Sequence, residues 1–119
     1  MTNAVPLKIL IVDDHEAMRR TVKQLFAGRN MNFVEAASGE EALKVFAAEQ
    51  PDWVVMDVRM PGMGGIRATR AIRQLDPQAR IVAISQFTGP DCSKAALDAG
   101  ALAFVNKEDL FQLRQIIEP

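Results

Sequence analysis

The stretch VVMDVRMPGMGG, from Val54 to Gly65, decides the fold that the chain is expected to adopt. It continues an apolar run that starts at Trp53, and the run ends on a carboxylate, Asp57. WVVMD is apolar throughout, which is typical of a strand buried on both faces of a parallel sheet. The Pro- and Gly-rich loop that follows places Asp57 at the carboxyl end of this strand.

Four more short runs predict strands, with Asn32–Ala36 the weaker of them, and a segment with helical spacing follows each run. The runs are Lys8–Val12, Asn32–Ala36, Arg80–Ile84 and Leu102–Val105. The predicted helices carry Met18, Val22, Leu25 and Phe26 before Gly28; Ala42, Leu43 and Phe46 after a Ser38–Glu41 capping box; Ile66, Ile72 and Leu75; Asp91 to Ala99; and Glu108 to Glu118. Right-handed crossovers need a helix between parallel strands, so this alternation predicts an α/β fold with a parallel five-stranded sheet and helices on both faces.

Length and composition limit the class of protein. With 119 residues and 49% hydrophobic content the chain can form one compact core, so residues 1–119 are predicted to be one domain. The net charge of -1 gives no basic field for nucleic acid or an anionic membrane. There is no signal peptide or membrane-spanning run, and the single cysteine, Cys92, fits a reducing compartment, so a cytoplasmic protein is expected. The single histidine, His15, is a poor metal-site candidate.

Polar side chains stand where the predicted strands end. They are Asp13 and Asp14, Asp57, Ser85, Asn106 and Lys107. Ligands of such sheets bind beyond the carboxyl ends of the strands, where the strand order reverses. Clustered carboxylates repel, so a cluster persists best beside a cation, and Mg²⁺ suits a few carboxylates with a phosphate oxygen. Each residue alone also fits a structural role, such as helix capping by Asp14, but their joint placement favours a site.

The motifs IVDDHEAMRR, VVMDVRMPGMGG, AIS and GALAFVNK together resemble the receiver domain of bacterial two-component response regulators. The resemblance extends over essentially the whole chain. It implies the strand order 2-1-3-4-5 of flavodoxin-like folds. It also implies a signalling protein of a phosphorelay rather than an enzyme that turns over a separate substrate.

The resemblance implies a role for the strand-end residues. Asp57 is expected to be the phosphoacceptor, and Lys107 to pair with the phosphoryl group. Asp13 and Asp14, together with Asp57 and the backbone carbonyl of Arg59, are expected to hold Mg²⁺. A carboxylate that approaches a phosphoryl group meets repulsion, which the metal and Lys107 relieve.

The family also has a switch that reads the phosphoryl group. By resemblance, Ser85 bonds a phosphoryl oxygen and vacates space that Phe104 then occupies. The surface of the fourth helix, fifth strand and fifth helix is expected to change, which favours an output contact or a phosphorylation-dependent homodimer. Phe104 fits equally well as a plain core residue of the fifth strand, and both interpretations stay open.

The partner implied by the resemblance is a histidine kinase or a histidine phosphotransfer protein. The matching docking positions on the first helix are Ala17, Met18 and Thr21, with Met18 also a candidate for the core. Three cations of the same helix are expected to tune the encounter rate, namely Arg19, Arg20 and Lys23.

Two other classes of protein deserve comparison. A small phosphohydrolase of the haloacid dehalogenase type also forms an aspartyl phosphate, but it places a second Asp two residues after the nucleophile, where this chain has Arg59. A flavodoxin-like flavin binder is disfavoured because DDHEA is acidic where a phosphate cradle is needed.

Some features of the sequence leave alternatives open. IRATRAIRQLDPQARIVAIS is closest to regulators with a C-terminal DNA-binding domain, so an excised receiver and a stand-alone receiver are both compatible with the sequence. The family often has Asp where Gly64 stands, and glycine is expected to serve there as a helix cap. Glu108 replaces the proline that often follows the lysine, so the isomer of that peptide bond is left open.

Overall fold

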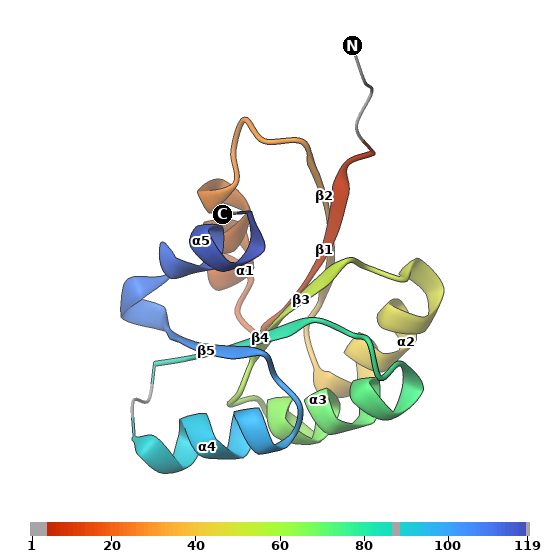
Figure 1. Cartoon of the computed structure of the whole chain (residues 1–119), viewed down its shortest axis with the longest axis vertical. Coiled ribbons are helices and arrows are strands. Elements are labelled where there is room, and N and C mark those ends of the chain that lie inside the picture. The colour runs from red at the N-terminus through yellow and green to blue at the C-terminus, as the bar shows by residue number, and fades with distance from the viewer. Residues whose placement is uncertain (1–4, 87–88, 119) are drawn as a thin grey trace.

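The computed structural model describes residues 5–86 and 89–118. It contains a parallel five-stranded sheet in the order β2-β1-β3-β4-β5, which confirms the predicted topology (Figure 1). The strands are β1 (Leu7–Val12), β2 (Met31–Ala36), β3 (Trp53–Asp57), β4 (Ile81–Ser85) and β5 (Ala103–Asn106). The loop predicted between Ser85 and Asp91 includes residues 87 and 88, which lie outside the described residues, as do residues 1–4 and 119.

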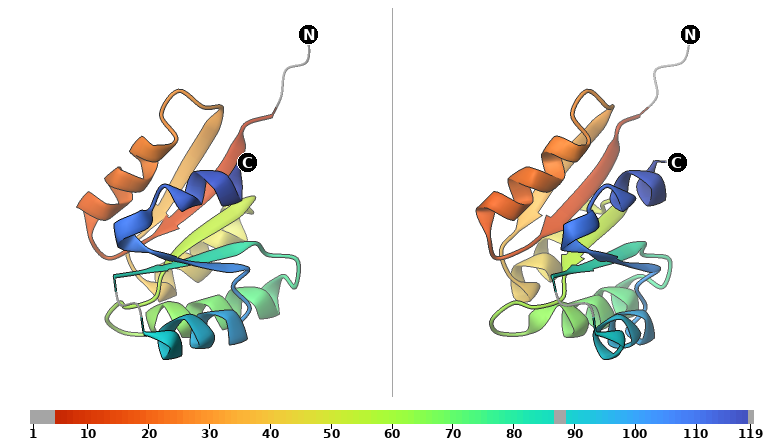
Figure 2. Two further views of the ribbon diagram at one scale, coloured as in Figure 1. Left: turned by 60° about the vertical axis from the view of Figure 1, so that its left-hand side comes forward. Right: turned by 90° about the vertical axis from the view of Figure 1, so that its left-hand side faces the viewer.

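Helices cover both faces of the sheet. They are α1 (Glu16–Leu25), α2 (Gly39–Glu49), α3 (Gly64–Leu75), α4 (Pro90–Asp98) and α5 (Gln112–Ile117), with a short 3-10 helix, η1 (Lys107–Asp109), before α5. Helices α1 and α5 lie on one face, and α2, α3 and α4 lie on the other (Figure 2). None of the helices in residues 5–86 and 89–118 has the length and apolar character needed to cross a bilayer.

The core forms two layers because side chains alternate between the faces of each strand. Toward α1 and α5 the strands contribute Ile9, Ile11, Val55, Val82, Ile84 and Val105. Toward α2 and α3 they contribute Leu10, Val12, Val54, Met56 and Ile81. All residues of β3 and β4 are buried, so these central strands are apolar throughout except where they end on Asp57 and Ser85.

The C-terminal helix differs from the prediction of one helix from Glu108 to Glu118. Asn106 Oδ1 accepts the Glu108 N–H at 2.8 Å and starts the tight turn of η1, so regular α-helix begins only at Gln112. Leu110, Leu113 and Ile117 still reach the core, as their spacing predicts. Another difference is Leu75, which was expected in the core but is 60% exposed, because it is the last residue of α3 and its side chain lies outside the buried layers.

The capping residues predicted at the helix ends are confirmed for α2 and differ for α3. Ser38 Oγ accepts the Glu41 N–H at 3.0 Å, as the capping box predicts, while Glu41 reaches the Ala37 N–H at 2.6 Å. Gly64 is important for a different reason than capping, because its φ of 78° lies in the left-handed region that favours glycine. No peptide bond in the described residues is cis, so the bond after Lys107 is trans.

Candidate functional site

The sheet topology brings the predicted strand-end residues together. Strands β1 and β3 are neighbours although β2 separates them in sequence, so strand order reverses at this point. Asp13 follows β1, Asp57 ends β3 and Ser85 ends β4. These three side chains belong to residues that are at most 2% exposed, which is unusual for carboxylates. The site is therefore an acidic pocket at the switch point of the sheet.

Lys107 supplies positive charge to this pocket. Its Nζ donates to Asp13 Oδ2 at 2.9 Å and lies 3.3 Å from Asp57 Oδ1. The lysine side chain is only 11% exposed, so little solvent screens these contacts. One cation thus bridges two buried carboxylates that come from neighbouring strands.

The electrostatics of Asp57 are unfavourable for its charged form. Burial, and then the negative charge of Asp13, raise the pKa of Asp57 to about 6, although Lys107 and the Arg59 N–H oppose the shift. The Arg59 N–H donates to Asp57 Oδ1 at 3.2 Å, which fixes the carboxylate. A divalent cation beside Asp57 would favour the ionised carboxylate, because it adds the positive charge that Lys107 alone does not supply.

Asp14 has a buried oxygen without a hydrogen-bond partner. Its Oδ1 is one of two such side-chain atoms in the part of the chain that the structure describes. Asp14 does not cap α1, because the cap position is His15 and no side-chain hydrogen bond is made there. The structural explanation of Asp14 as a helix cap is therefore wrong, and a buried carboxylate oxygen of this kind fits a cation ligand.

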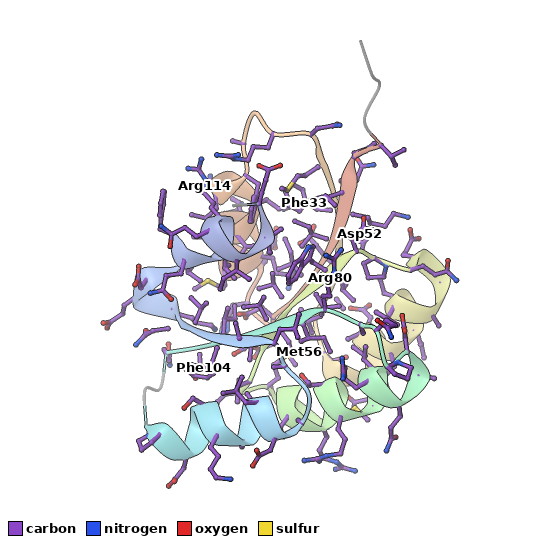
Figure 3. The ribbon with its side chains drawn as sticks, in the orientation of Figure 1. Phe33, Asp52, Met56, Arg80, Phe104 and Arg114 are labelled. Carbon is purple, nitrogen blue, oxygen red and sulfur yellow. The ribbon has the colours of Figure 1, made fainter. Side chains whose placement is uncertain are left out.

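Ser85 and Phe104 lie on adjacent strands and on the same face of the sheet, because Phe104 pairs with Ala83, two residues before Ser85. Ser85 Oγ lies 3.9 Å from the Cys92 thiol of α4. Phe104 is half-buried and packs against the small cluster of Val58, Ala83, Ala96 and Ala101, between the sheet and α4 (Figure 3). This packing agrees with a core role for Phe104 in the present conformation and leaves its role as a switch untested.

The expected docking positions lie next to the acidic pocket. Ala17 and Thr21 are exposed, and Thr21 Oγ1 donates to the Ala17 carbonyl at 3.0 Å. Met18 packs against the core, as its alternative role predicts, and it also lines the pocket, while its docking role stays a prediction. The pocket, of about 320 Å³, is lined by Ala17, Met18, Asp57, Arg59, Ser85 and Lys107 and by two residues that were not expected there, His15 and Gln86.

The basic side chains of α1 are engaged within the domain. Arg19 Nε and Lys23 Nζ bind the two carboxylate oxygens of Glu35 at 2.8 and 2.9 Å. Lys23 and Arg19 thereby lower the pKa of Glu35. Arg19 also donates to the Asp13 carbonyl at 2.8 Å, so it supports the loop that carries the acids. These pairings were missed because Glu35 comes from a different element, β2.

His15 is the clearest omission from the sequence-based site. Its Nδ1 lies 3.3 Å from Asp13 Oδ1 and 3.2 Å from Asp14 Oδ1. These three residues form a group whose ligand atoms all lie within 4.8 Å of one another. The run DDH was the available signal, and it was discounted because a single histidine was judged in isolation.

The parallel α/β sheet with an acidic, lysine-containing pocket at its switch point agrees with the class of signalling domains that the motifs resemble. The family model described as the response regulator receiver domain matches residues 9–118, and the chain belongs to this family. The resemblance inferred from the motifs is thus confirmed, and so is the function as a receiver domain of two-component response regulators.

Relatives and solved structures agree with this family. The chain is 42% identical over 102 residues to the transcriptional activator protein ExaE of Pseudomonas putida. The aligned region covers 83% of this chain and 47% of ExaE. A LuxR-family two-component response regulator from Aurantimonas sp. SI85-9A1 is similar with a TM-score of 0.88 at 40% identity, over 95% of this chain and 83% of that one. The CheX–CheY–BeF3–Mg²⁺ complex from Borrelia burgdorferi is similar with a TM-score of 0.85 at 28% identity, over 97% and 92% of the two chains.

The chain spans about half the length of several curated relatives that it matches, ExaE among them.

Proposed function

We propose that this receiver accepts a phosphoryl group on Asp57 from a histidine kinase or a histidine phosphotransfer protein. The observation that carries the proposal is the position of Asp57: a carboxylate 2% exposed, at the end of β3, beside Lys107 and the buried Asp13. The chain catalyses only its own phosphorylation and dephosphorylation. It acts in the cytoplasm, as a single domain over residues 1–119, and contacts neither membrane nor nucleic acid itself.

The transfer step is a displacement at phosphorus. Asp57 Oδ1 is engaged by the Arg59 N–H and faces Lys107, so we assign the attack to Oδ2. A bond forms between Oδ2 and phosphorus while the bond from phosphorus to the donor nitrogen or oxygen breaks, and the donor leaves with that electron pair. Lys107 Nζ then lies close enough to pair with the phosphoryl oxygens and to balance part of the added negative charge.

Mg²⁺ is the cation that we propose for the acidic pocket. Asp13, Asp14, Asp57 and the backbone carbonyl of Arg59 offer hard oxygen ligands, and the unpartnered Oδ1 of Asp14 supports this ligand set. When bound, Mg²⁺ supplies charge neutralisation and in-line orientation for phosphoryl transfer. A solved relative, the CheX–CheY complex from Borrelia burgdorferi, contains BeF3 and Mg²⁺.

Ser85 and Phe104 are the proposed readout of phosphorylation. A shift of Ser85 toward the phosphoryl group would free space near β5, and Phe104 lies on that strand, on the same face of the sheet as Ser85. The surface that changes is α4–β5–α5, which exposes Leu97, Leu102 and Phe111 at 47 to 54%. Such a surface suits an output contact or a phosphorylation-dependent homodimer, since exposed apolar side chains favour association.

Ala17 and Thr21, with the edge of Met18, are the proposed contact for the phosphodonor protein. All three come from the first two turns of α1, and Ala17 and Met18 line the same pocket as Asp57. A donor helix that packs here would bring its phosphohistidine to the acidic pocket. If bulky or charged residues at 17 and 21 left transfer from a cognate kinase unchanged, this docking assignment would be wrong.

The chemistry can be tested with a small phosphodonor. With acetyl phosphate and Mg²⁺, intact mass spectrometry should show one added phosphoryl group that hydroxylamine removes, as expected for an acyl phosphate. Asp57→Asn and chelation of Mg²⁺ should each abolish the addition. Asp52→Asn, at the opposite end of β3, is the matched control and should keep it. A stable phosphoryl group on serine or threonine would contradict the proposal, and so would turnover of added phosphate esters.

A further inference from the structure

His15 holds a fixed backbone position directly beside the two acids of the first loop. Its N–H donates to Asp13 Oδ1 at 2.9 Å, and its carbonyl accepts the N–H groups of Met18 and Arg19 at 3.1 and 3.2 Å. The imidazole itself is 73% exposed, so it can turn without disturbing the core. Exposed side chains change rotamer readily, so the ring can turn toward a ligand while the backbone stays in place.

The ring nitrogen is spaced from the carboxylates as ligands of one ion are. His15 Nδ1 lies 3.3 Å from Asp13 Oδ1 and 3.2 Å from Asp14 Oδ1. Two ligands about 2.1 Å from an ion are about 3.0 Å apart at a right angle and about 3.4 Å apart at a tetrahedral angle. The observed distances fall between these two values.

The unpartnered oxygen of Asp14 lies on the same side as the ring. Oδ1 of Asp14 is buried and has no hydrogen-bond partner, and His15 Nδ1 lies 3.2 Å from it. Lys107 supplies its charge to Asp13 and Asp57 and has no ion pair with Asp14 among the described contacts. A buried carboxylate oxygen in this state is best stabilised by a cation.

We propose that His15 Nδ1 is an additional ligand for those cations in this pocket that accept imidazole, and that it shifts the metal preference of the pocket toward such ions. The inference rests on the metal site of the proposed function and adds a specificity-determining residue to it. Imidazole suits borderline ions such as Zn²⁺, whereas carboxylate, carbonyl and water suit Mg²⁺. Zn²⁺ therefore gains a ligand from His15, while Mg²⁺ is held by oxygen atoms whether or not the ring is present.

If the ring has a different role, its removal should change the metal affinity in the opposite direction. As a protonated imidazolium, His15 would only neutralise Asp13 and Asp14 in the absence of metal. A divalent ion would then have to displace it, so removal of the ring would strengthen the binding of Mg²⁺ and Zn²⁺ alike. The direction of the change in affinity separates the two roles.

The chain is well suited to a direct experiment because it has a single histidine and a single cysteine. The untagged protein in a Cys92→Ser background excludes thiol binding and leaves His15 as the sole imidazole. Calorimetric titration with Mg²⁺ and with Zn²⁺ would compare this protein with His15→Phe, which keeps a flat ring without nitrogen, and with His15→Gln. Gln24→Ala, an exposed change elsewhere on α1, is the control.

Both His15 variants should bind Zn²⁺ about tenfold more weakly or worse, which is the size of effect seen when even an outer partner of a metal is lost. Their Mg²⁺ affinity should change by less than about twofold, because magnesium prefers oxygen ligands. In ¹⁵N spectra, Zn²⁺ should shift the Nδ1 resonance of His15 far more than the Nε2 resonance. Equal losses for both ions, stronger binding of both, or an unmoved Nδ1 resonance would each overturn the inference.

The proposed function is tested separately, by measuring the Mg²⁺-dependent phosphorylation of Asp57. Phosphorylation with an unmoved Nδ1 resonance would reject the role of His15 alone. A shifted Nδ1 resonance with no phosphorylation would support His15 as a ligand while it rejects the phosphoacceptor role.

Discussion

The charged side chains at the two ends of the sheet differ in how deeply they are buried and in how well they are paired. At the amino ends of the strands, Lys8 Nζ lies 3.1 Å from Glu49 Oε1, and these side chains are 35% and 43% exposed. The Arg80 guanidinium stacks 4.5 Å from the Trp53 ring, and Arg80 Nε donates to the Asp52 carbonyl at 3.2 Å (Figure 3). Positive and negative groups are matched there, and solvent reaches them.

At the carboxyl ends the charges are buried and not balanced. Lys107 faces Asp13 and Asp57, and Asp14 adds a further carboxylate with a buried, unpartnered oxygen. Exposed pairs contribute about 0 to 1 kcal/mol, whereas a shift of about two pKa units in a buried group corresponds to about 3 kcal/mol. The exposed pairs at the amino ends of the strands therefore stabilise the fold only slightly. The buried, unbalanced charges at the carboxyl ends destabilise it, which favours the binding of a cation and reaction with a phosphoryl group.

The largest expected effect comes from the same substitution made at each end. Lys107→Met leaves two buried carboxylates without their shared cation and should lower the free energy of unfolding by about 3 to 5 kcal/mol at pH 7.5. Lys8→Met removes an exposed pair and should cost about 1 kcal/mol or less. Urea unfolding followed by the fluorescence of Trp53, the single tryptophan, measures both. If the two variants lost equal free energy of unfolding, the proposed difference between the two ends of the sheet would be wrong.

Asp57→Asn should stabilise the metal-free domain. The pKa of Asp57 is about 6 in the folded protein against 3.8 for the ordinary group, so the folded state holds the proton more tightly than the unfolded chain. Stability is therefore lost as the pH rises from about 4 to about 6, and the full penalty is present above that range. The uncharged amide of the variant avoids this penalty. The free energy of unfolding should therefore rise by about 2 to 3 kcal/mol at pH 7.5, and this gain should fade below pH about 4.

This gain should be read from urea unfolding in the presence of chelator at several pH values. Asp52→Asn at the amino end is the control and should show no such pH-dependent gain. A pH-independent gain at position 57 would mean that burial of the charge is not its cause.

Mg²⁺ should stabilise the wild-type domain through the carboxyl end only. At a concentration one hundred times its dissociation constant, a ligand that binds only the folded state adds about 2.7 kcal/mol. Asp14→Asn should remove most of this gain, and Glu49→Gln should keep it. The measurement is the shift in the urea midpoint on adding Mg²⁺, and equal shifts in both variants would contradict the assignment of Asp14 as a ligand.

The smallest effect is expected at the amino end. Arg80→Gln removes the stacking on Trp53 and should cost about 0.5 to 1 kcal/mol. Metal affinity at the opposite end should stay unchanged, because the sites do not share a contact among the described residues. A loss above about 2 kcal/mol would show that the amino end contributes far more than an exposed contact does.

Local patterns were sufficient to predict most of the fold. Trp53–Asp57 was assigned with the observed bounds, because continuous apolar sequence between turn residues has few other solutions. The gathering of Asp13, Asp57, Ser85 and Lys107 followed from their positions after strands, since parallel strands end at one edge of a sheet. Their chemical roles came from the family resemblance and stay predictions.

Local patterns failed at the ends of two helices and at a contact between elements that are distant in sequence. Leu75 has the spacing of a core residue but lies exposed at the end of α3, and the last helix is shortened by a turn that Asn106 initiates. The binding of Arg19 and Lys23 by Glu35 joins α1 to β2, and no periodicity encodes such a pair. Boundaries and partners of this kind depend on packing rather than on propensity.

The sequence by itself determined the α/β alternation, the buried central strands and the placement of acids and a lysine after them, because these follow from hydrophobic period and chain connectivity. Only the tertiary structure decided that Lys107 bridges Asp13 and Asp57, and that His15 stands beside an Asp14 oxygen that lacks a partner. Charge interactions fall off with distance and strengthen with burial, and both quantities are fixed only when strands distant in sequence pack side by side.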